Sequence, residues 1–166
     1  MAWEIVYHRT ADGRVPALDF LIDECPPSVE ADLLAALAAV ADAPPPAFAG
    51  GGRWEAMHGA MGGYYEVRTT GPGRRHYRLF CLLERIDEVD DRGLERSAIA
   101  VVTGMWKSNA TLFTDAEYRR HVRALGDDYR NQRPRRIAGE RDLAAYLAKV
   151  AAKDERAQQG KRKRRG

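Results

Sequence analysis

The sequence predicts an α+β protein with a small, mainly antiparallel sheet, two helices near its start and one after its last strand. Apolar residues repeat at helical spacing from 16 to 43, and a capping box at Thr114 marks a further helix. Between 62 and 102 the spacing changes to that of strands. The order is therefore strand, two helices, three strands and a helix, followed by a basic C-terminal extension.

Composition favours a folded domain with an appendage. The chain has 166 residues, of which 45% are hydrophobic and 31% charged. It contains no apolar run of the roughly 20 residues that a bilayer span needs, and residues 1–8 do not resemble a secretory signal. Cys25 and Cys81 lie far apart with no metal-binding spacing. We therefore expect a soluble cytoplasmic protein with no membrane partner, metal or cofactor.

The net charge of +3 conceals an uneven distribution. Residues 130–166 contain 13 Lys and Arg against 4 Asp and Glu, a net charge of +9. Residues 1–129 contain 14 against 20, a net charge of −6. The basic character therefore belongs to the C-terminal region, and the body depends on a few placed cations for any contact with nucleic acid.

The N-terminal region predicts a strand and two helices. Residues 3–8 are β-branched and aromatic at their centre, which favours a strand. Pro16 is suited to the first turn of a helix, which ends before Pro26-Pro27. Ser28 is predicted to be the N-cap of an Ala-rich second helix. Three prolines then begin a linker over residues 44–53.

Three strands are expected next. Residues 64–70 and 75–86 form a hairpin around a tight turn at 71–73. A charged, exposed loop is expected over 87–96. The apolar run at 98–102 then predicts a strand that is buried on both faces.

The rest of the chain is predicted to be helical. Thr114 and Glu117 have the spacing of a capping box, which begins a helix that runs to about Tyr129. After a break at 132–136, an amphipathic segment places three apolar residues at helical spacing: Leu143, Leu147 and Val150. We therefore divide the chain into a domain over 1–130 and a basic tail with a short amphipathic helix over 131–166.

The hairpin gathers charged side chains on one face. If pairing is symmetric about Pro72, Arg68 lies opposite His76 and Glu66 lies opposite Arg78. The same register places Tyr64 opposite Phe80. The other face carries only core residues: Tyr65, Val67, Tyr77, Leu79, Cys81 and Leu83. A solvated surface with a Glu66–Arg78 pair explains this pattern as well as a binding site does.

Lys107 follows the last strand and is well placed to reach the same surface. Two arginines, a lysine and a histidine suit a phosphodiester, because cations stabilise the non-bridging oxygens and His76 can transfer a proton. The same groups would also suit simple phosphate or carboxylate binding.

Three short motifs resemble the RelE/HigB toxin superfamily, and its phage-derived HigB-type branch most of all. They are Tyr-Glu-Val-Arg at 65–68, Tyr-Arg-Leu-Phe at 77–80 and Gly-Met-Trp-Lys at 104–107. With the order of elements, the resemblance covers about residues 3–130. It implies a RelE-like fold, in which the two N-terminal helices pack on one face of the sheet.

The resemblance also implies a function. Such proteins are the toxins of type II toxin–antitoxin pairs, with a cognate antitoxin, the ribosome and mRNA as partners. They are metal-independent mRNA endoribonucleases, in which a ribose 2′-OH attacks the adjacent phosphate within the ribosomal A site.

The family's functional residues map onto several positions of this chain. Arg78 matches the catalytic arginine, Arg68 the supporting strand arginine and Lys107 the cation after the last strand. Tyr129, in Asp-Tyr at 128–129, resembles a tyrosine that packs against an mRNA base; a helix-end aromatic docked on the core is the alternative.

His76 has no family counterpart, so its role as a proton-transfer or substrate-binding group rests on its predicted position. Arg74 and Arg75 are further substrate-binding candidates because they lie beside the hairpin turn. Trp54, just before the hairpin, is expected to pack in the core.

The chain also departs from the family pattern. Ser108 replaces a second lysine, Trp106 stands at the aromatic position and Glu66 lies where some relatives are basic. Two alternatives therefore stay open. One is a non-enzymatic toxin of the same fold that inhibits a target such as gyrase. The other is an inactive phage-derived remnant that binds RNA or an antitoxin.

The basic tail has three possible roles. It could be a disordered solubilising end, or it could hold ribosomal RNA through phosphate contacts. Its apolar residues could instead pack on the body or contact an antitoxin helix.

Overall fold

A five-stranded mixed sheet forms the centre of the protein. The computed structural model describes residues 3–44, 52–89, 95–109, 111–132 and 135–166. The strands are β1 (Glu4–Tyr7), β2 (Trp54–Ala56), β3 (Tyr64–Thr70), β4 (His76–Val89) and β5 (Glu95–Lys107). Their order is β1-β5-β4-β3-β2, and only β1 and β5 run parallel. The α+β class and the mainly antiparallel sheet are confirmed.

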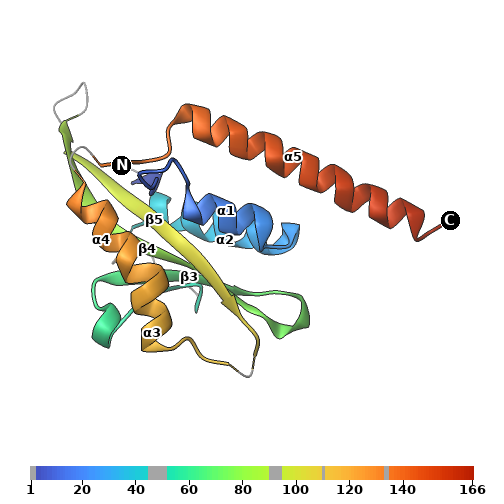
Figure 1. Ribbon diagram of the computed structural model, residues 1–166, viewed down its shortest axis with the longest axis horizontal. Coiled ribbons are helices and arrows are strands. Elements are labelled where there is room, and N and C mark those ends of the chain that lie inside the picture. Colours follow the sequence, from blue (N-terminus) through green and yellow to red (C-terminus); the bar gives the residue numbers. More distant parts are fainter. Residues whose placement is uncertain (1–2, 45–51, 90–94, 110, 133–134) are drawn as a thin grey trace.

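Helices cover both faces of this sheet (Figure 1). On one face lie α1 (Pro16–Asp23) and α2 (Pro27–Asp42). On the other lies a continuous helical segment made of α3 (Asp115–Glu117), the π-helical turn η4 (Tyr118–Arg123) and α4 (Ala124–Asn131). The last helix, α5 (Glu140–Lys163), packs beside α1. No helix of the described residues is both long enough and apolar enough to span a membrane.

The two layers of helices enclose separate cores. Alternate strand residues such as Val67, Leu79 and Ile99 pack beneath α1 and α2. The intervening residues Phe80 and Leu82 pack beneath the helical segment that follows β5. The expected apolar face is therefore confirmed, but part of the opposite face is also buried instead of facing solvent.

Several boundaries differ from those predicted. Two short helical turns, η2 (Gly59–Met61) and η3 (Pro72–Arg74), flank β3. The three-residue strand β2 was not expected, and the predicted loop at 87–96 is shorter because β4 reaches Val89 and β5 begins at Glu95. Most of the predicted linker, residues 45–51, and residues 90–94 of the predicted loop lie outside the described residues.

Of the two predicted helix N-caps, Thr114 is confirmed and Ser28 is wrong. Thr114 accepts a hydrogen bond from the Glu117 backbone N–H, and the Glu117 carboxylate accepts one from the Thr114 N–H, so the capping box is confirmed. Ser28 is not an N-cap: the cap position is Pro26, which has no side-chain donor or acceptor. Pro27 instead fixes the backbone angle of the first helical residue.

The tail forms a 24-residue helix whose first half is docked on the body. The Tyr146 hydroxyl donates to the Glu30 carboxylate at 3.1 Å, and both residues are buried. Lys153 donates to the backbone carbonyls of Leu21 and Cys25, near the end of α1. These contacts match the alternative in which the tail packs on the body.

The apolar stripe predicted for the tail is partly wrong. Leu143 and Val150 are half-buried against the core, but Leu147 is 64% exposed. Tyr146 takes the buried position, because its hydroxyl can reach Glu30 while its ring packs among apolar side chains.

Glu30 predicts a pH dependence of stability. Burial raises the pKa of its carboxyl above the usual value of 4.5, against the attraction of Lys153 and the Tyr146 hydrogen bond. The unfolded chain therefore releases this proton first, and the group's contribution to stability falls as the pH rises through the raised pKa. We expect Glu30→Gln to be more stable than the wild type at pH 7, with a gap that closes toward pH 4.5. Denaturant unfolding across this range tests it, and a constant gap would contradict it.

Candidate functional site

The predicted charged residues do share one face of the sheet, but their pairing differs from that expected. Arg68 lies opposite Arg78, and Thr70 lies opposite His76. His76 in turn lies opposite Lys107 on β5. Because side chains directly opposite one another project to the same side, these four side chains share a face. We call Arg68, His76, Arg78 and Lys107 the charged face.

The turn explains the error in register. The hairpin is centred on Gly73 instead of Pro72, which moves each β4 partner by two residues and leaves the faces unchanged. Tyr64 consequently lies opposite Leu82 instead of Phe80, and Glu66 lies opposite Phe80. Gly73 and Arg74 both have left-handed backbone angles, with φ of 70° and 56°. A turn of this shape cannot be deduced from Gly-Pro-Gly alone.

Glu66 joins the two arginines. Its carboxylate accepts a hydrogen bond from Arg78 Nη1 at 2.9 Å, and its other oxygen lies 3.6 Å from Arg68 Nη1. Glu66 is buried, so its charge needs these partners. The carboxylate also offsets the repulsion between two arginines on opposite strand positions.

Arg68 is held by further contacts. Its Nη1 lies 3.0 Å from the Glu55 carboxylate on β2, and its Nε donates to the Gly52 carbonyl at 2.7 Å. The unpredicted strand β2 therefore supplies part of this site. The Arg68 guanidinium is fixed in orientation and partly neutralised.

Lys107 is paired with Glu117. Its ammonium donates to the Glu117 carboxylate, which holds the pKa of this carboxyl below its usual value. Because Glu117 also closes the capping box of α3, the lysine is tied to the start of that helix.

Two aromatic residues complete the surroundings of Arg78. The Phe113 ring centroid lies 5.2 Å from the Arg78 guanidinium carbon and 5.9 Å from Lys107 Nζ. Tyr118 contacts Arg78 through its hydroxyl, although burial raises the pKa of this phenol overall. Neither residue was predicted to belong to the site, because both follow the last matched motif.

The other predicted site residues do not all reach the charged face. His76 Nε2 lies 3.0 Å from the Asn109 side-chain oxygen, at the same end of the sheet as Lys107. Arg75 stacks on Trp106, with its guanidinium carbon 4.4 Å from the ring. Since Trp106 projects from β5 on the side opposite Lys107, the structure does not bring Arg75 to the charged face. Arg74 is exposed in the turn.

Tyr129 is not placed to contact RNA. It is fully buried at the end of α4, in the core beneath the helical segment. Its ring packs edge-on against the buried His8, whose Nε2 lies 2.9 Å from Asp128. The prediction that Tyr129 meets a base is therefore corrected in favour of the core alternative. Trp54 is buried and stacks on Tyr65, as expected.

Two hollows adjoin Arg78. One, of about 480 Å³, is lined by residues before β2 and on the hairpin: Gly52, Arg53, Arg68, Thr69, Thr70, His76 and Arg78. The other, of about 280 Å³, lies between Glu66, Arg78 and Tyr118. The first is bounded by three arginines and a histidine, which suits an anionic group.

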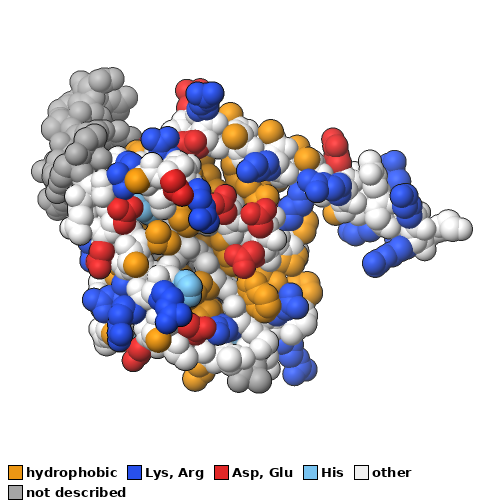
Figure 2. Space-filling model, in the orientation of Figure 1, with side chains coloured by type: hydrophobic (Ala, Val, Ile, Leu, Met, Phe, Trp, Pro, Cys, Tyr) orange, Lys and Arg blue, Asp and Glu red, His pale blue; other side chains and the backbone are white. Residues whose placement is uncertain are grey.

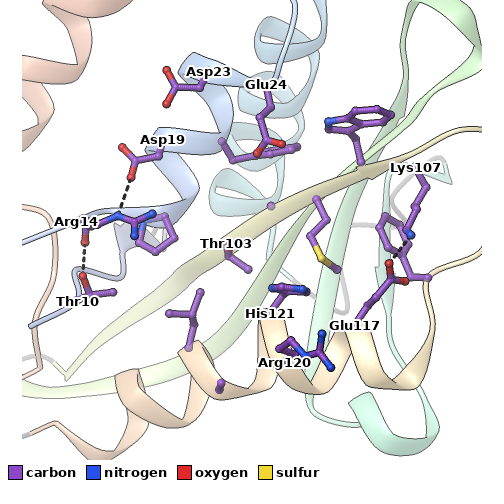
Figure 3. A pocket seen from close by; sticks show the side chains of 18 of the residues that line it. Thr10, Arg14, Asp19, Asp23, Glu24, Thr103, Lys107, Glu117, Arg120 and His121 are labelled. Atoms are coloured by element: carbon purple, nitrogen blue, oxygen red, sulfur yellow. Dashed lines mark hydrogen bonds and ion pairs between the residues drawn. The ribbon is translucent and has the colours of Figure 1, made fainter. Parts of the chain in front are cut away.

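Lys107 opens onto a different and larger groove, of about 1140 Å³, between α1, β5 and the helical segment. Figure 3 shows Lys107 and Glu117 turned toward each other at one side of this groove. Asp19 and Asp23 on α1, and Glu24 directly after it, lie at the other side. The groove is mixed in charge. Because Lys107 lines this groove while Arg68 and Arg78 line the hollow of about 480 Å³, the three cations predicted to be catalytic are divided between two hollows.

Thiol and metal chemistry find no support in the described residues. Cys25 and Cys81 are both buried and free, and burial raises the pKa of Cys25 to about 12. Within the described parts of the chain, no three His, Cys, Asp or Glu side chains are grouped so that they could hold a metal ion.

Comparisons with known proteins add no assignment: no family model, curated protein or solved structure matches the chain. The fold and the site define an α+β protein with a five-stranded mixed sheet, on which arginines and a lysine are held by carboxylates.

Proposed function

We propose that the chain is the toxin of a toxin–antitoxin pair and cleaves mRNA on the ribosome. One observation carries the proposal: Arg68, Arg78 and His76 line the same hollow of about 480 Å³, with Lys107 on the strand position opposite His76. Cations beside an imidazole support this proposal, because cations can stabilise the charge that develops on a phosphodiester and an imidazole can accept the proton of the attacking ribose hydroxyl.

The proposed reaction is a transesterification. The ribose 2′-oxygen attacks the adjacent phosphorus while His76 accepts the 2′-OH proton. Arg78, supported by Arg68, stabilises the added charge on the non-bridging oxygens. The bond to the 5′-oxygen of the next nucleotide then breaks, and Lys107 supplies the proton to that oxygen. The products are a 2′,3′-cyclic phosphate and a free 5′-hydroxyl.

Carboxylates orient the predicted catalytic cations and also compete with the substrate for them. Glu66, Glu55 and Glu117 pair with the three predicted catalytic cations. Substrate phosphate must compete with these carboxylates for Arg78 and Lys107, so we expect the ribosome-bound RNA to rearrange at least the Lys107–Glu117 pair. The paired cations are pre-oriented, which lowers the entropy cost of binding.

The same pairing favours a second candidate, a non-catalytic toxin that binds and inhibits a target such as gyrase. In that case the ion pairs are structural, and the carboxylates neutralise cations that have no part in catalysis. The inactive remnant that only binds RNA or an antitoxin is a further non-catalytic alternative.

Pulse labelling after induction in a bacterial host separates the two functions. An mRNA endoribonuclease is expected to stop incorporation of labelled amino acids within minutes, while DNA synthesis continues at first. Gyrase inhibition is expected to produce DNA damage and filamentous cells before protein synthesis falls. The latter result would reject the proposed function.

A further inference from the structure

The end of α5 has no role in the fold or in the proposed reaction. Its last hydrogen bonds to the body among the described residues are made by Lys153, at the end of α1. The helix continues to Lys163, which at 1.5 Å per residue is about 15 Å farther. Figure 1 shows this end of α5 extending past α1 and α2.

This projecting segment, residues 156–166, is strongly basic. All of its residues are exposed, and it contains six Lys and Arg with no Asp or Glu: Arg156, Lys161, Arg162, Lys163, Arg164 and Arg165. Figure 2 shows Lys and Arg side chains along the extended end of the molecule. We call residues 156–166 the basic arm.

The docked half of α5 fixes the direction of the arm. Tyr146 and Lys153 lie seven residues apart, or about two helical turns, and both bond to the N-terminal helices. A helix that is anchored at two points and continues without a break presents its charges at a defined place. This differs from a disordered tail, in which the same charges would be dispersed.

We infer that the basic arm binds the phosphate backbone of double-stranded RNA and holds the protein on structured RNA. The choice of RNA rests on the proposed function, whereas the choice of a phosphate backbone rests on the arm. Cations occupy the last three positions of the helix, 161–163, and the two residues that follow it, 164 and 165, so the arm presents charge in several directions and can contact phosphates on both sides of a groove.

The composition of the arm argues against other polyanions. Single-stranded RNA binders use aromatic side chains as stacking platforms, and the arm has none. A helix that lies in a membrane surface needs an apolar face, and Ala157 is the only hydrophobic residue of the arm. Contacts limited to phosphates predict binding that is independent of sequence and sensitive to salt.

Two variants and one labelled probe test the inference. The probe is a 20-base-pair RNA duplex, measured by fluorescence anisotropy from 50 to 200 mM salt. A chain that ends at Gln159 lacks five of the six cations but keeps Tyr146 and Lys153. The control is Arg141→Gln with Lys149→Gln, which removes exposed cations from the docked half.

The full chain is expected to lose about a thousandfold in affinity across this salt range, as for a protein with six phosphate contacts. Truncation at Gln159 is expected to weaken binding at least tenfold at 50 mM and to reduce the salt slope by about four to five. The control is expected to stay within twofold of the wild type.

Equal affinity and slope for the truncated and full chains would overturn the inference. So would tighter binding to a DNA duplex of the same sequence, to single-stranded RNA, or to anionic vesicles. Failure of the proposed function is distinguishable: if the wild type does not cleave RNA but the truncation still abolishes duplex binding, the arm inference stands without the nuclease.

Discussion

Alanine at position 78 is expected to reduce RNA cleavage by about 10²–10³-fold, the usual cost of one donor that stabilises a charged transition state. Arg78 lines both hollows of the charged face and contacts Glu66, Phe113 and Tyr118. Loss of its charge removes the cation that lines both hollows. Cleavage is measured with purified ribosomes and a defined mRNA, and growth after induction gives a parallel result.

A second variant separates charge from structure. Arg78→Ala leaves the buried Glu66 carboxylate without its 2.9 Å partner, which could weaken the fold. Arg78→Gln removes the positive charge but keeps an N–H donor toward Glu66, on a shorter side chain. Both variants are expected to be inactive, and Arg78→Gln is expected to unfold close to the wild type. The control Arg141→Gln, on α5, is expected to cleave normally. Full cleavage by a folded Arg78→Gln protein would show that Arg78 is not catalytic.

The largest effect on stability is expected at Gly104. A Cβ atom built there lies 2.1 Å from the Phe20 ring, which is itself buried between α1 and β5. Gly104→Ala therefore forces α1 away from the strand that ends in Lys107, and we expect a loss of about 2–3 kcal/mol in the free energy of unfolding. Denaturant unfolding measures this loss.

Gly160→Ala is the matched control for that substitution. Gly160 lies in α5, and a Cβ there meets nothing within 4 Å. The same change is expected to favour the helix by about 1 kcal/mol, because alanine has the higher helix propensity. If both variants were equally stable, Phe20 would not be packed against Gly104 as described.

Local chemistry explains what the sequence predicted well. The capping box at Thr114 depends on residues three apart, and the strand at 64–70 is marked by alternation and by flanking glycines. The two faces of the hairpin followed from the same alternation. These features need no knowledge of distant parts of the chain.

The geometry of the hairpin turn, the shortest strand and the contacts between distant residues were not predicted. The hairpin register depends on left-handed angles at Gly73 and Arg74, and strand β2 is too short to show a pattern. Glu117 was identified as a capping residue, but its pairing with Lys107 depends on how α3 docks on β5. The sequence was compatible with Tyr129 either contacting an RNA base or docking on the core, and its burial in the structure decides for the core.

Mapping the 5′ ends of cellular mRNA after induction tests the central claim most directly. The wild type and Arg78→Gln are compared with and without a block of translation initiation. New 5′ ends within translated codons are expected for the wild type, and they should disappear under the block and in the variant. Growth arrest without new 5′ ends, or cuts that persist in the variant, would contradict the assignment of the charged face as a ribosome-dependent nuclease site.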